Sequence, residues 1–399
     1  MIQLKNHEKL EVLAGGSTVK KKYETPFGDK RILFLEKLSN RIRNLKDASN
    51  YPDLITFSFW CRKGNLFIFQ KHYKDIENRF GRGLVFHIAP SNVPLNFGYS
   101  FIFGFLSGNA NVIRIPTKKY DQVNILISLI NSLLNEQKFK CFRESNAFIK
   151  YDRSNKINKF LSKHSDARII WGGDETIIDL RKNELPIRSV DIAFSDRVSV
   201  CLIDTAMLKE LNSKSFYRLI KGFYNDTFLL DQNACSSPHL ILWIGHAEQE
   251  VINVFWNELF KYTMKKYSLE FSKINNKYNV LCNAAIEMGG RFQFTNYDNF
   301  IYRVTLKDLP KNIDAFFGDS GLFFEYHINN LESINHILTD KYQTLTYYGV
   351  EKKIILKFLK NLNSNSIDRV VPIGKALDIG LIWDGYDIIR TLSRKISIF

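Results

Sequence analysis

A single cysteine stands among small and polar residues in the segment DQNACSSP, residues 231–238. A structural cysteine usually lies among Leu, Val and Ile, where it behaves as a small hydrophobe. Cys235 instead follows Ala234 and precedes two serines and a proline, which leaves space for a substrate and brings hydroxyl and amide donors nearby. Two interpretations are open at this point: a nucleophilic thiolate, or an ordinary thiol in a turn.

Three further loops carry residues that suit a ligand. They are HIAPSNVP (87–94), RIPTK (114–118) and WGGDE (171–175), and each follows a segment that reads as a strand. In an open parallel sheet, ligands bind at the carboxyl ends of the strands. The prolines, the cation and the Gly-Gly turn therefore predict a cofactor crevice.

The elements that must position these loops alternate between strand and helix, which predicts a parallel sheet with helices on both faces. The pattern restarts after about residue 205 and predicts a second α/β unit around the cysteine. Strands are predicted at 83–89, 111–116, 167–171, 198–204, 240–244, 301–306, 322–326 and 342–349, and helices at 96–107, 120–137, 156–164, 249–268 and 330–338. The aromatic segments 53–60 and 66–70 are predicted to be extended.

Composition excludes several classes of protein. The chain has 399 residues, and its five cysteines are scattered without a CxxC pair, which argues against a disulfide framework and a zinc site and suits a reducing cytoplasm. The N-terminal segment lacks the apolar core of a secretory signal, and the longest apolar run, 97–106, is too short to span a bilayer. The net charge of +15 is dispersed along the chain, and its densest basic runs match no nucleic-acid-binding motif, so nucleic acid is not an expected partner. A membrane span is not expected either, because no apolar run is long enough.

Taken in order, these motifs resemble the aldehyde dehydrogenase superfamily: IxPxNxP, a helix, GNxxVxR, a Gly-Gly turn, and a lone cysteine after an amide residue. The segments HIAPSNVP, QNACSSP and RVVPIGKALDIGLIWDGYDIIRTLSR are similar to those of the bacterial LuxC-like fatty acyl-CoA reductases. The resemblance covers roughly residues 80–395. It implies a Rossmann-type nicotinamide cofactor domain over 1–205, an α/β catalytic domain over 206–366, and a segment, 367–399, that closes on the active site or on an oligomer interface.

The resemblance assigns chemical roles to two residues. Cys235 would take the acyl group from a thioester, and Asn92 would donate its side-chain amide to the oxyanion, with the backbone N–H of the cysteine as second donor. An asparagine that merely satisfies its own turn before a proline is the alternative for Asn92.

The cofactor residues follow from the same resemblance. Arg114 stands where the family usually has a lysine that contacts the adenosine ribose, and an arginine can bind a 2′-phosphate bidentately. NADPH is therefore the expected cofactor, with NADH as the alternative. Gly172 and Gly173 match the family's turn that lets the pyrophosphate approach a helix N-terminus, but Asp174 and Glu175 open that helix and their charge would repel the phosphate. The expected cofactor-binding residues are Ile88, Pro90, Ser91, Arg114, Gly172 and Gly173.

Departures from the family pattern are informative. Oxidising members carry a general-base glutamate, and Ala193 stands at the corresponding position, although Asp191 or Asp196 could take that role. His87 is interpreted as a residue bonded within the sheet rather than as one that tunes the site. The glutamate that holds the nicotinamide ribose has no clear counterpart, and the nearest match is DAFFGDSG, 314–321. The segment VPIGK, 371–375, resembles the family's C-terminal loop.

These features together predict an NADPH-dependent reductase that converts a fatty acyl-CoA or acyl-protein thioester to the aldehyde. An oxidising aldehyde dehydrogenase and a non-catalytic binding protein on the same fold are the alternatives. A homo-oligomer and an acyl-protein synthetase are the partners that the resemblance implies.

Overall fold

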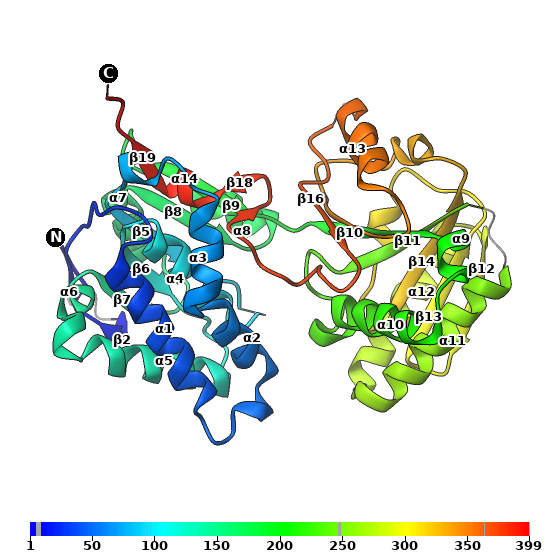
Figure 1. Cartoon of the computed structure of the whole chain (residues 1–399), viewed down its shortest axis with the longest axis horizontal. Coiled ribbons are helices and arrows are strands. Elements are labelled where there is room, and N and C mark those ends of the chain that lie inside the picture. Colours follow the sequence, from blue (N-terminus) through cyan, green and yellow to red (C-terminus); the bar gives the residue numbers. More distant parts are fainter. Residues whose placement is uncertain (5–8, 92, 246–248, 363, 399) are drawn as a thin grey trace. The chain divides into compact units, whose positions relative to one another are not determined.

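The computed structural model describes residues 1–4, 9–91, 93–245, 249–362 and 364–398. The described residues form two compact units, one made of residues 1–195 with 381–399 and one made of residues 196–380 (Figure 1). Among the helices of this part of the chain, none combines the length and the apolar composition that a bilayer span requires.

The boundaries of the units differ from the expected ones. We expected the first domain to reach residue 205, but β10 (Val198–Asp204) pairs with β11 (Pro238–Ile244) and β15 (Tyr342–Tyr348) in the second unit. The expected C-terminal segment, 367–399, is divided between the units. β16 (Arg369–Pro372) adds to the second sheet, whereas β19 (Ser393–Lys395) pairs with β4 (Arg79–Gly81) in the first unit.

The first unit is built on a sheet with the order β2-β7-β6-β5-β8-β9, in which β2 is antiparallel to β7 and the other neighbours are parallel. The direction in which strands are added reverses at β5. The chain first adds β6 and β7 on one side of β5 and then adds β8 and β9 on its other side. Such a switch point is where an open sheet forms its crevice. The strands are β2 (Glu11–Gly15), β5 (Leu84–Ile88), β6 (Ala110–Arg114), β7 (Asn146–Lys150), β8 (Ala167–Trp171) and β9 (Val190–Phe194).

Helices cover both faces of this sheet. One face packs on α7 and α8 through Ile157, Leu161 and Ile177. On the other face, aromatic rings join α1, α4 and the sheet, with ring centroids 5.4 Å apart for Phe34 and Phe105 and 4.9 Å for Phe101 and Phe148. The helices of the unit are α1 (Asp29–Arg43), α2 (Pro52–Trp60), α3 (Lys63–Lys71), α4 (Asn96–Leu106), α5 (Asp121–Leu134), α6 (Lys140–Arg143), α7 (Asn155–His164), α8 (Asp174–Arg181) and α14 (Ile388–Leu392).

The expected extended segments at 53–60 and 66–70 are helices, α2 and α3, so that prediction was wrong. Pro52 occupies the first turn of α2, where its missing N–H has no helical partner to lose. Leu54, Phe57 and Ser58 are buried at helical spacing, and the rings of Phe57 and Tyr99 of α4 lie 5.0 Å apart. Tertiary packing on one helical face outweighs the strand preference of the aromatic and β-branched residues.

The second unit has a sheet of the order β12-β13-β14-β11-β10-β15-β16, with β12 antiparallel to β13 and the other pairs parallel. Helices α12 and α13 pack on one face and α9, α10 and α11 on the other (Figure 1). The remaining strands are β12 (Phe292–Tyr297), β13 (Ile301–Leu306) and β14 (Leu322–Ile328), and the helices are α9 (Thr205–Lys209), α10 (Ser213–Thr227), α11 (Gln249–Lys266), α12 (Phe271–Glu287) and α13 (Lys352–Asn361).

The helix expected at 330–338 is reduced to a short 3-10 turn, Leu331–Ile334. Asn330 caps this turn by accepting from the backbone N–H of Ser333, while Ile337 and Leu338 continue into the core. The spacing of the apolar residues in 330–338 correctly predicts which side chains are buried, but the segment before β15 forms only this short turn and no regular helix.

A buried carboxylate ties the second sheet to α11. Glu325 on β14 accepts from the indole N–H groups of Trp243 and Trp256, each at 2.9 Å. Its other oxygen accepts from Arg303 Nε and Thr305 Oγ1, both at 2.5 Å. Arg303 and Glu325 expose 4% and 1% of their surface, so each charge depends on the other for compensation.

We expect Glu325→Leu to lower the free energy of unfolding by about 3–5 kcal/mol, because the substitution leaves Arg303 as an uncompensated buried charge. Urea unfolding followed by tryptophan fluorescence measures the change. Glu332→Leu on the exposed side of the 3-10 turn is the matched control, with an expected change below about 0.5 kcal/mol. Equal losses in the two variants would contradict this account of the core.

Candidate active site

The turn that carries Cys235 is held by the side chain of Gln232, which is fully buried. Its Nε2 donates to the carbonyls of Pro238 and Leu322, at 3.0 and 3.1 Å, and its Oε1 accepts from Gly321 N at 2.9 Å. One carboxamide thus joins the start of β11 to the start of β14. Gln232 has a left-handed backbone, φ 61°, which turns the chain toward the cysteine.

The backbone beyond Gln232 is fixed by two serines. Ser199 Oγ of β10 donates to the carbonyl of Cys235 at 2.7 Å. Ser237 N donates to the carbonyl of Ala234 at 2.8 Å, and Ser237 Oγ donates to the carbonyl of Asp226 at 2.7 Å. These two hydroxyl groups bond to main-chain carbonyls of Cys235 and Asp226, and they therefore fix the backbone that carries the thiol.

Cys235 lines a cavity of about 370 Å³ within the second unit. The cavity lies where β10, β11 and β14 begin, and thus at the amino ends of parallel strands. Its lining residues are Asp196, Arg197, Val198, Gln232, Asn233, Ala234, Cys235, His239, Asn276, Lys277, Val280, Asp314, Phe317, Gly318 and Asp319. The predicted segment 314–321 therefore contributes to the same cavity as the predicted nucleophile.

Two basic side chains of the cavity are tightly held. Lys277 Nζ donates to the carbonyls of Asn299, Phe300 and Ser320, at 2.6, 3.2 and 2.8 Å, and burial lowers its pKa to about 8. His239 Nδ1 donates to the Gly318 carbonyl at 2.8 Å, and burial lowers the pKa of this ring to about 4. The histidine is therefore neutral near pH 7, and the lysine fixes the loop 318–320.

The other cysteines lack this setting. Cys201 and Cys61 are fully buried, and burial raises the pKa of both thiols. Cys201 lies in β10 among core residues, as predicted. Cys141 and Cys282 are partly exposed, but neither lines the cavity of Cys235.

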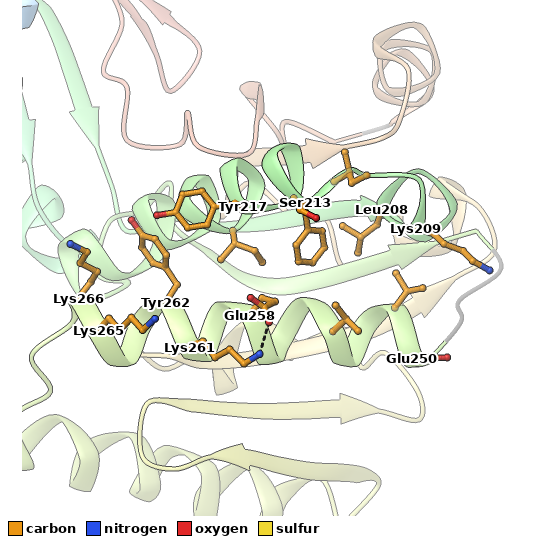
Figure 2. Close-up of a pocket in the computed structure, with 15 residues that line it drawn as sticks. Leu208, Lys209, Ser213, Tyr217, Glu250, Glu258, Lys261, Tyr262, Lys265 and Lys266 are labelled. Carbon is orange, nitrogen blue, oxygen red and sulfur yellow. Dashed lines mark hydrogen bonds and ion pairs between the residues drawn. The ribbon is translucent and has the colours of Figure 1, made fainter.

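A larger groove of about 830 Å³ lies elsewhere in the second unit, between α10 and α11. Figure 2 shows its tyrosines Tyr217 and Tyr262 facing each other, with Lys265 and Lys266 toward one end. Leu208, Val251 and Val254 contribute apolar surface, but the lining contains no cysteine. We take the smaller cavity as the candidate site because it combines a thiol with convergent polar groups.

The predicted loop 371–375 is anchored to the helix that precedes the cysteine turn. Asp226 of α10 accepts from Gly374 N and Ala376 N, the latter at 2.9 Å. Gly374 and Gly222 pack backbone against backbone, and a Cβ on Gly374 would lie 3.0 Å from the Gly222 Cα. Burial raises the pKa of Asp226 to about 7 although these two N–H groups oppose the shift.

In the first unit, the predicted cofactor residues lie at the carboxyl ends of three adjacent parallel strands. Ile88 ends β5 and leads to Pro90 and Ser91, Arg114 ends β6, and the Gly-Gly turn follows β8. The fold thus brings the three predicted loops to one edge at the switch point. Asn92 lies outside the described residues.

Arg114 stacks over Tyr151, with its Cζ 4.7 Å from the ring centroid. Its Nη2 donates to the Tyr151 carbonyl at 3.4 Å, and its buried Nε has no hydrogen-bond partner among the described residues. The planar cation is thus held in place with donor capacity remaining, which suits an anionic or hydroxyl-rich ligand.

Gly172 and Gly173 lead into α8 without a side-chain cap on the first turn, so its N–H groups are not satisfied by a capping residue. Such a turn accepts a pyrophosphate through backbone N–H groups. Asp174 and Glu175 in the same turn oppose that binding electrostatically. The cofactor residues fit the group apart from these two charges.

His87 is a sheet residue, as predicted. It is fully buried, with Nδ1 2.9 Å from Ser100 Oγ and Nε2 3.0 Å from Asn111 Oδ1. Burial lowers the pKa of this ring to about 4. Its role is to link β5 to α4 and β6.

The residue at the family position of the general base and the two carboxylates that could replace it lie in different places. Ala193 of β9 packs against the apolar core of the first unit. Asp191 is engaged by Arg168 at 2.9 Å and Arg181 at 3.2 Å. Asp196 lines the cavity of Cys235, which makes it the stronger of the two carboxylates for that role.

A sequence model described as acyl-CoA reductase (LuxC) matches residues 64–395. The chain belongs to the LuxC family. Curated relatives include the long-chain acyl-protein thioester reductases of Aliivibrio fischeri, 23% identical over 327 residues, and of Photorhabdus luminescens, 21% identical over 324 residues. The alignments cover 79% and 80% of this chain but 64% and 63% of the relatives, so the chain spans less than two thirds of their length.

The solved structures that resemble this LuxC-family chain are aldehyde dehydrogenases. Aldehyde dehydrogenase 21 from Physcomitrella patens aligns with a TM-score of 0.63 at 11% identity, over 92% of this chain and 84% of that one. The 1-pyrroline-5-carboxylate dehydrogenase from Thermus, solved with bound NAD, aligns with a TM-score of 0.62 at 10% identity, over 92% and 80%. The predicted aldehyde dehydrogenase-like α/β fold is therefore confirmed.

Sequence reasoning missed several residues around Cys235. His239 lines the cavity and is close to the cysteine in sequence, but no motif singled it out. Lys277 of α12, 42 positions beyond Cys235, lines the same cavity, and Gln343 of β15, 108 positions beyond it, contacts the thiol. Gln232 was quoted within a motif but given no role.

We expect Asp226 to contribute a loss of unfolding free energy as pH rises from about 4 to about 7, because it keeps a proton in the folded state that the unfolded chain has lost. His87 and His239, whose pKa values are lowered to about 4, contribute a gain over the same range, so Asp226→Asn should make the slope of unfolding free energy against pH more positive than in the wild type. Asp340→Asn, at an exposed position, is the control and should keep the slope. A slope unchanged in Asp226→Asn would contradict the shifted pKa.

Proposed function

We propose that the chain reduces a fatty acyl thioester to the corresponding aldehyde through an acyl-enzyme on Cys235. The observation that carries the proposal is the thiol at a polar cavity, held by Gln232 and Ser199, in a chain of the LuxC family. The relatives' names describe long-chain acyl-protein thioester reductases, which supports the same class of substrate.

The first step is an exchange between two sulfur atoms. The Cys235 thiolate attacks the carbonyl carbon of the substrate, the bond to the donor sulfur breaks, and the donor leaves as a thiolate. The exchange is close to thermoneutral, and the product is again a thioester. Its carbonyl carbon stays more electrophilic than that of the ester a serine would form.

The oxyanion that develops on the carbonyl needs fixed donors. The resemblance gives this role to the Asn92 amide together with the backbone N–H of Cys235. A preorganised donor of this kind is worth roughly 2.7–4 kcal/mol. The hydrogen bonds of Ser199 and Gln232 support it because they fix the backbone that carries the second donor.

The residues at the carboxyl edge of the first sheet would hold the cofactor: Ile88, Pro90, Ser91, Arg114, Gly172 and Gly173. When bound there, a reduced nicotinamide cofactor would supply the hydride for the acyl carbon. Arg114 favours NADPH because a stacked guanidinium matches a 2′-phosphate. Once the carbon is reduced, the carbon–sulfur bond breaks, the aldehyde leaves, and Cys235 returns as a thiolate.

An oxidising aldehyde dehydrogenase is the second candidate, and Asp196 is the observation in its favour. A carboxylate in the cavity could activate water to hydrolyse the acyl-enzyme. Ala193 at the family position of the base argues for reduction. Aldehyde oxidation in the absence of CoA, lost in Asp196→Asn, would favour the oxidising function.

The acyl donor is either a free CoA thioester or a protein-bound thioester, and the relatives' names favour the second. We propose an acyl-protein synthetase as the partner that would supply such a thioester. We also propose that the chain assembles as a homo-oligomer.

Replacing the nucleophile tests the proposal directly. We expect Cys235→Ser to lower the turnover of acyl-CoA to aldehyde by at least about 10³-fold, because serine lacks an ionised nucleophile and forms a less reactive ester. Cofactor oxidation and aldehyde formation are measured together. Cys282→Ser is the control and should keep the wild-type rate. A Cys235→Ser variant with wild-type turnover would rule out the proposed nucleophile.

Cofactor choice gives a separate prediction. We expect Arg114→Leu to raise the KM for NADPH by about 10-fold or more, with a much smaller effect on NADH, because a charge-assisted contact with the 2′-phosphate is lost. Steady-state kinetics with each cofactor measure the ratio. Arg143→Leu, exposed on α6 before β7, is the control. Equal losses for both cofactors would reject the phosphate contact.

A further inference from the structure

The side chain of Gln343 on β15 reaches the thiol of Cys235. Its Nε2 donates to the cysteine Sγ at 3.3 Å, a distance suited to an N–H···S hydrogen bond. Gln343 exposes 1% of its surface, so its carboxamide is withdrawn from solvent. The contact joins residues 108 positions apart in the chain.

The other end of this carboxamide bonds to its neighbour. Thr344 Oγ1 donates to Gln343 Oε1 at 3.0 Å. A flipped amide would place its NH₂ group against this hydroxyl, which can also accept, and its oxygen against the sulfur. Because an amide oxygen facing a thiolate is repelled, the ionised form of Cys235 favours the orientation in which Nε2 donates to Sγ.

The same strand also fixes the backbone of the cysteine. Thr344 N donates to Ser199 Oγ at 3.2 Å, and that hydroxyl donates to the Cys235 carbonyl at 2.7 Å. β15 thus controls the main chain of Cys235 through Ser199 and its side chain through Gln343.

The basic side chains that line the cavity donate hydrogen bonds to groups other than the thiol. His239 is neutral near pH 7, and Lys277 gives its N–H groups to three backbone carbonyls. Arg197 donates to the Tyr342 carbonyl at 2.8 Å and to Asp368. The remaining titratable lining residues are the carboxylates Asp196, Asp314 and Asp319, which do not favour a second negative charge.

We propose that Gln343 is a positioning residue that orients Sγ of Cys235 and stabilises its thiolate by donating the Nε2 hydrogen bond. The inference rests on the proposed function, in which Cys235 is the nucleophile. A hydrogen bond to the charged form favours ionisation, and a neutral amide provides it without adding a group that titrates.

The test is the pH dependence of Cys235 alkylation in the full chain. Iodoacetamide is the probe, and peptide mass spectrometry isolates Cys235 from the other four cysteines. We expect Gln343→Leu to move the midpoint of the rate profile up by about one pH unit and to slow alkylation near pH 7 by about 10-fold. A role in packing alone would lower thermal stability and leave the midpoint unchanged.

Three further variants sharpen the test. Gln343→Glu keeps the shape of the side chain but removes the donor, so its midpoint should rise at least as far, and it decides the question if Gln343→Leu does not fold. Thr344→Val frees the amide and should give a smaller shift. Thr346→Val, which loses a buried hydroxyl on the same strand, is the matched control and should keep the wild-type profile.

An unchanged midpoint in both Gln343 variants would overturn the inference. Its failure is distinguishable from failure of the proposed function. If acyl-CoA acylates Cys235 but the Gln343 variants titrate as wild type, the inference alone fails. If the midpoint shifts but no acyl-enzyme forms, Gln343 is confirmed as the hydrogen-bond donor to the thiolate and the proposed reaction fails.

Discussion

The carboxamide of Gln232 is the interaction on which the candidate site depends. It bonds to carbonyls at the starts of β11 and β14 and to the N–H of Gly321, and it is fully buried. Unmade hydrogen bonds at this depth would cost the desolvation of several backbone groups, so the turn has little freedom to relax. This constraint places the backbone of the turn, and the contacts that Ser199 and Gln343 make with Cys235 act on a main chain that is already fixed.

Neutral dipoles dominate the surroundings of the thiol. Amide and hydroxyl groups from Gln343, Ser199 and Thr344 contact the cysteine or each other. Lys277 donates to backbone carbonyls, and Arg197 donates to the Tyr342 carbonyl and to Asp368. Fixed dipoles need no reorganisation when charge develops on the sulfur or on the substrate, and this is the property that preorganised sites exploit.

Much of the fold could be predicted because local signals agreed with tertiary structure. The strands predicted at 83–89, 111–116 and 167–171 are short, mostly apolar runs, and the structure has β5 (Leu84–Ile88), β6 (Ala110–Arg114) and β8 (Ala167–Trp171) there. The prediction failed at α2 because Phe, Ile and Thr favour strands locally, whereas the burial of Phe57 against Tyr99 favours a helix. The boundary of the first unit was misplaced because the composition of 198–204 does not reveal which sheet the strand joins.

The candidate site could be predicted only in part, for a related reason. Cys235 and the Gly-Gly turn carry local signals, since a thiol among small residues and paired glycines are unusual in any context. Gln343 and Lys277 have no such signal, because a single glutamine or lysine is ordinary until the fold brings it to the thiol or to the cavity. Residues that act through hydrogen bonds across parallel strands are separated by whole βα units, and sequence spacing alone does not place them.

The central claim is that Cys235 carries the acyl group as a thioester. The most direct measurement is peptide mass spectrometry of the protein after brief exposure to a long-chain acyl-CoA without cofactor, followed by addition of NADPH. The account predicts an acyl adduct on Cys235 that disappears with NADPH as an equivalent amount of aldehyde forms. An unmodified Cys235, or an adduct that NADPH does not discharge, would contradict it.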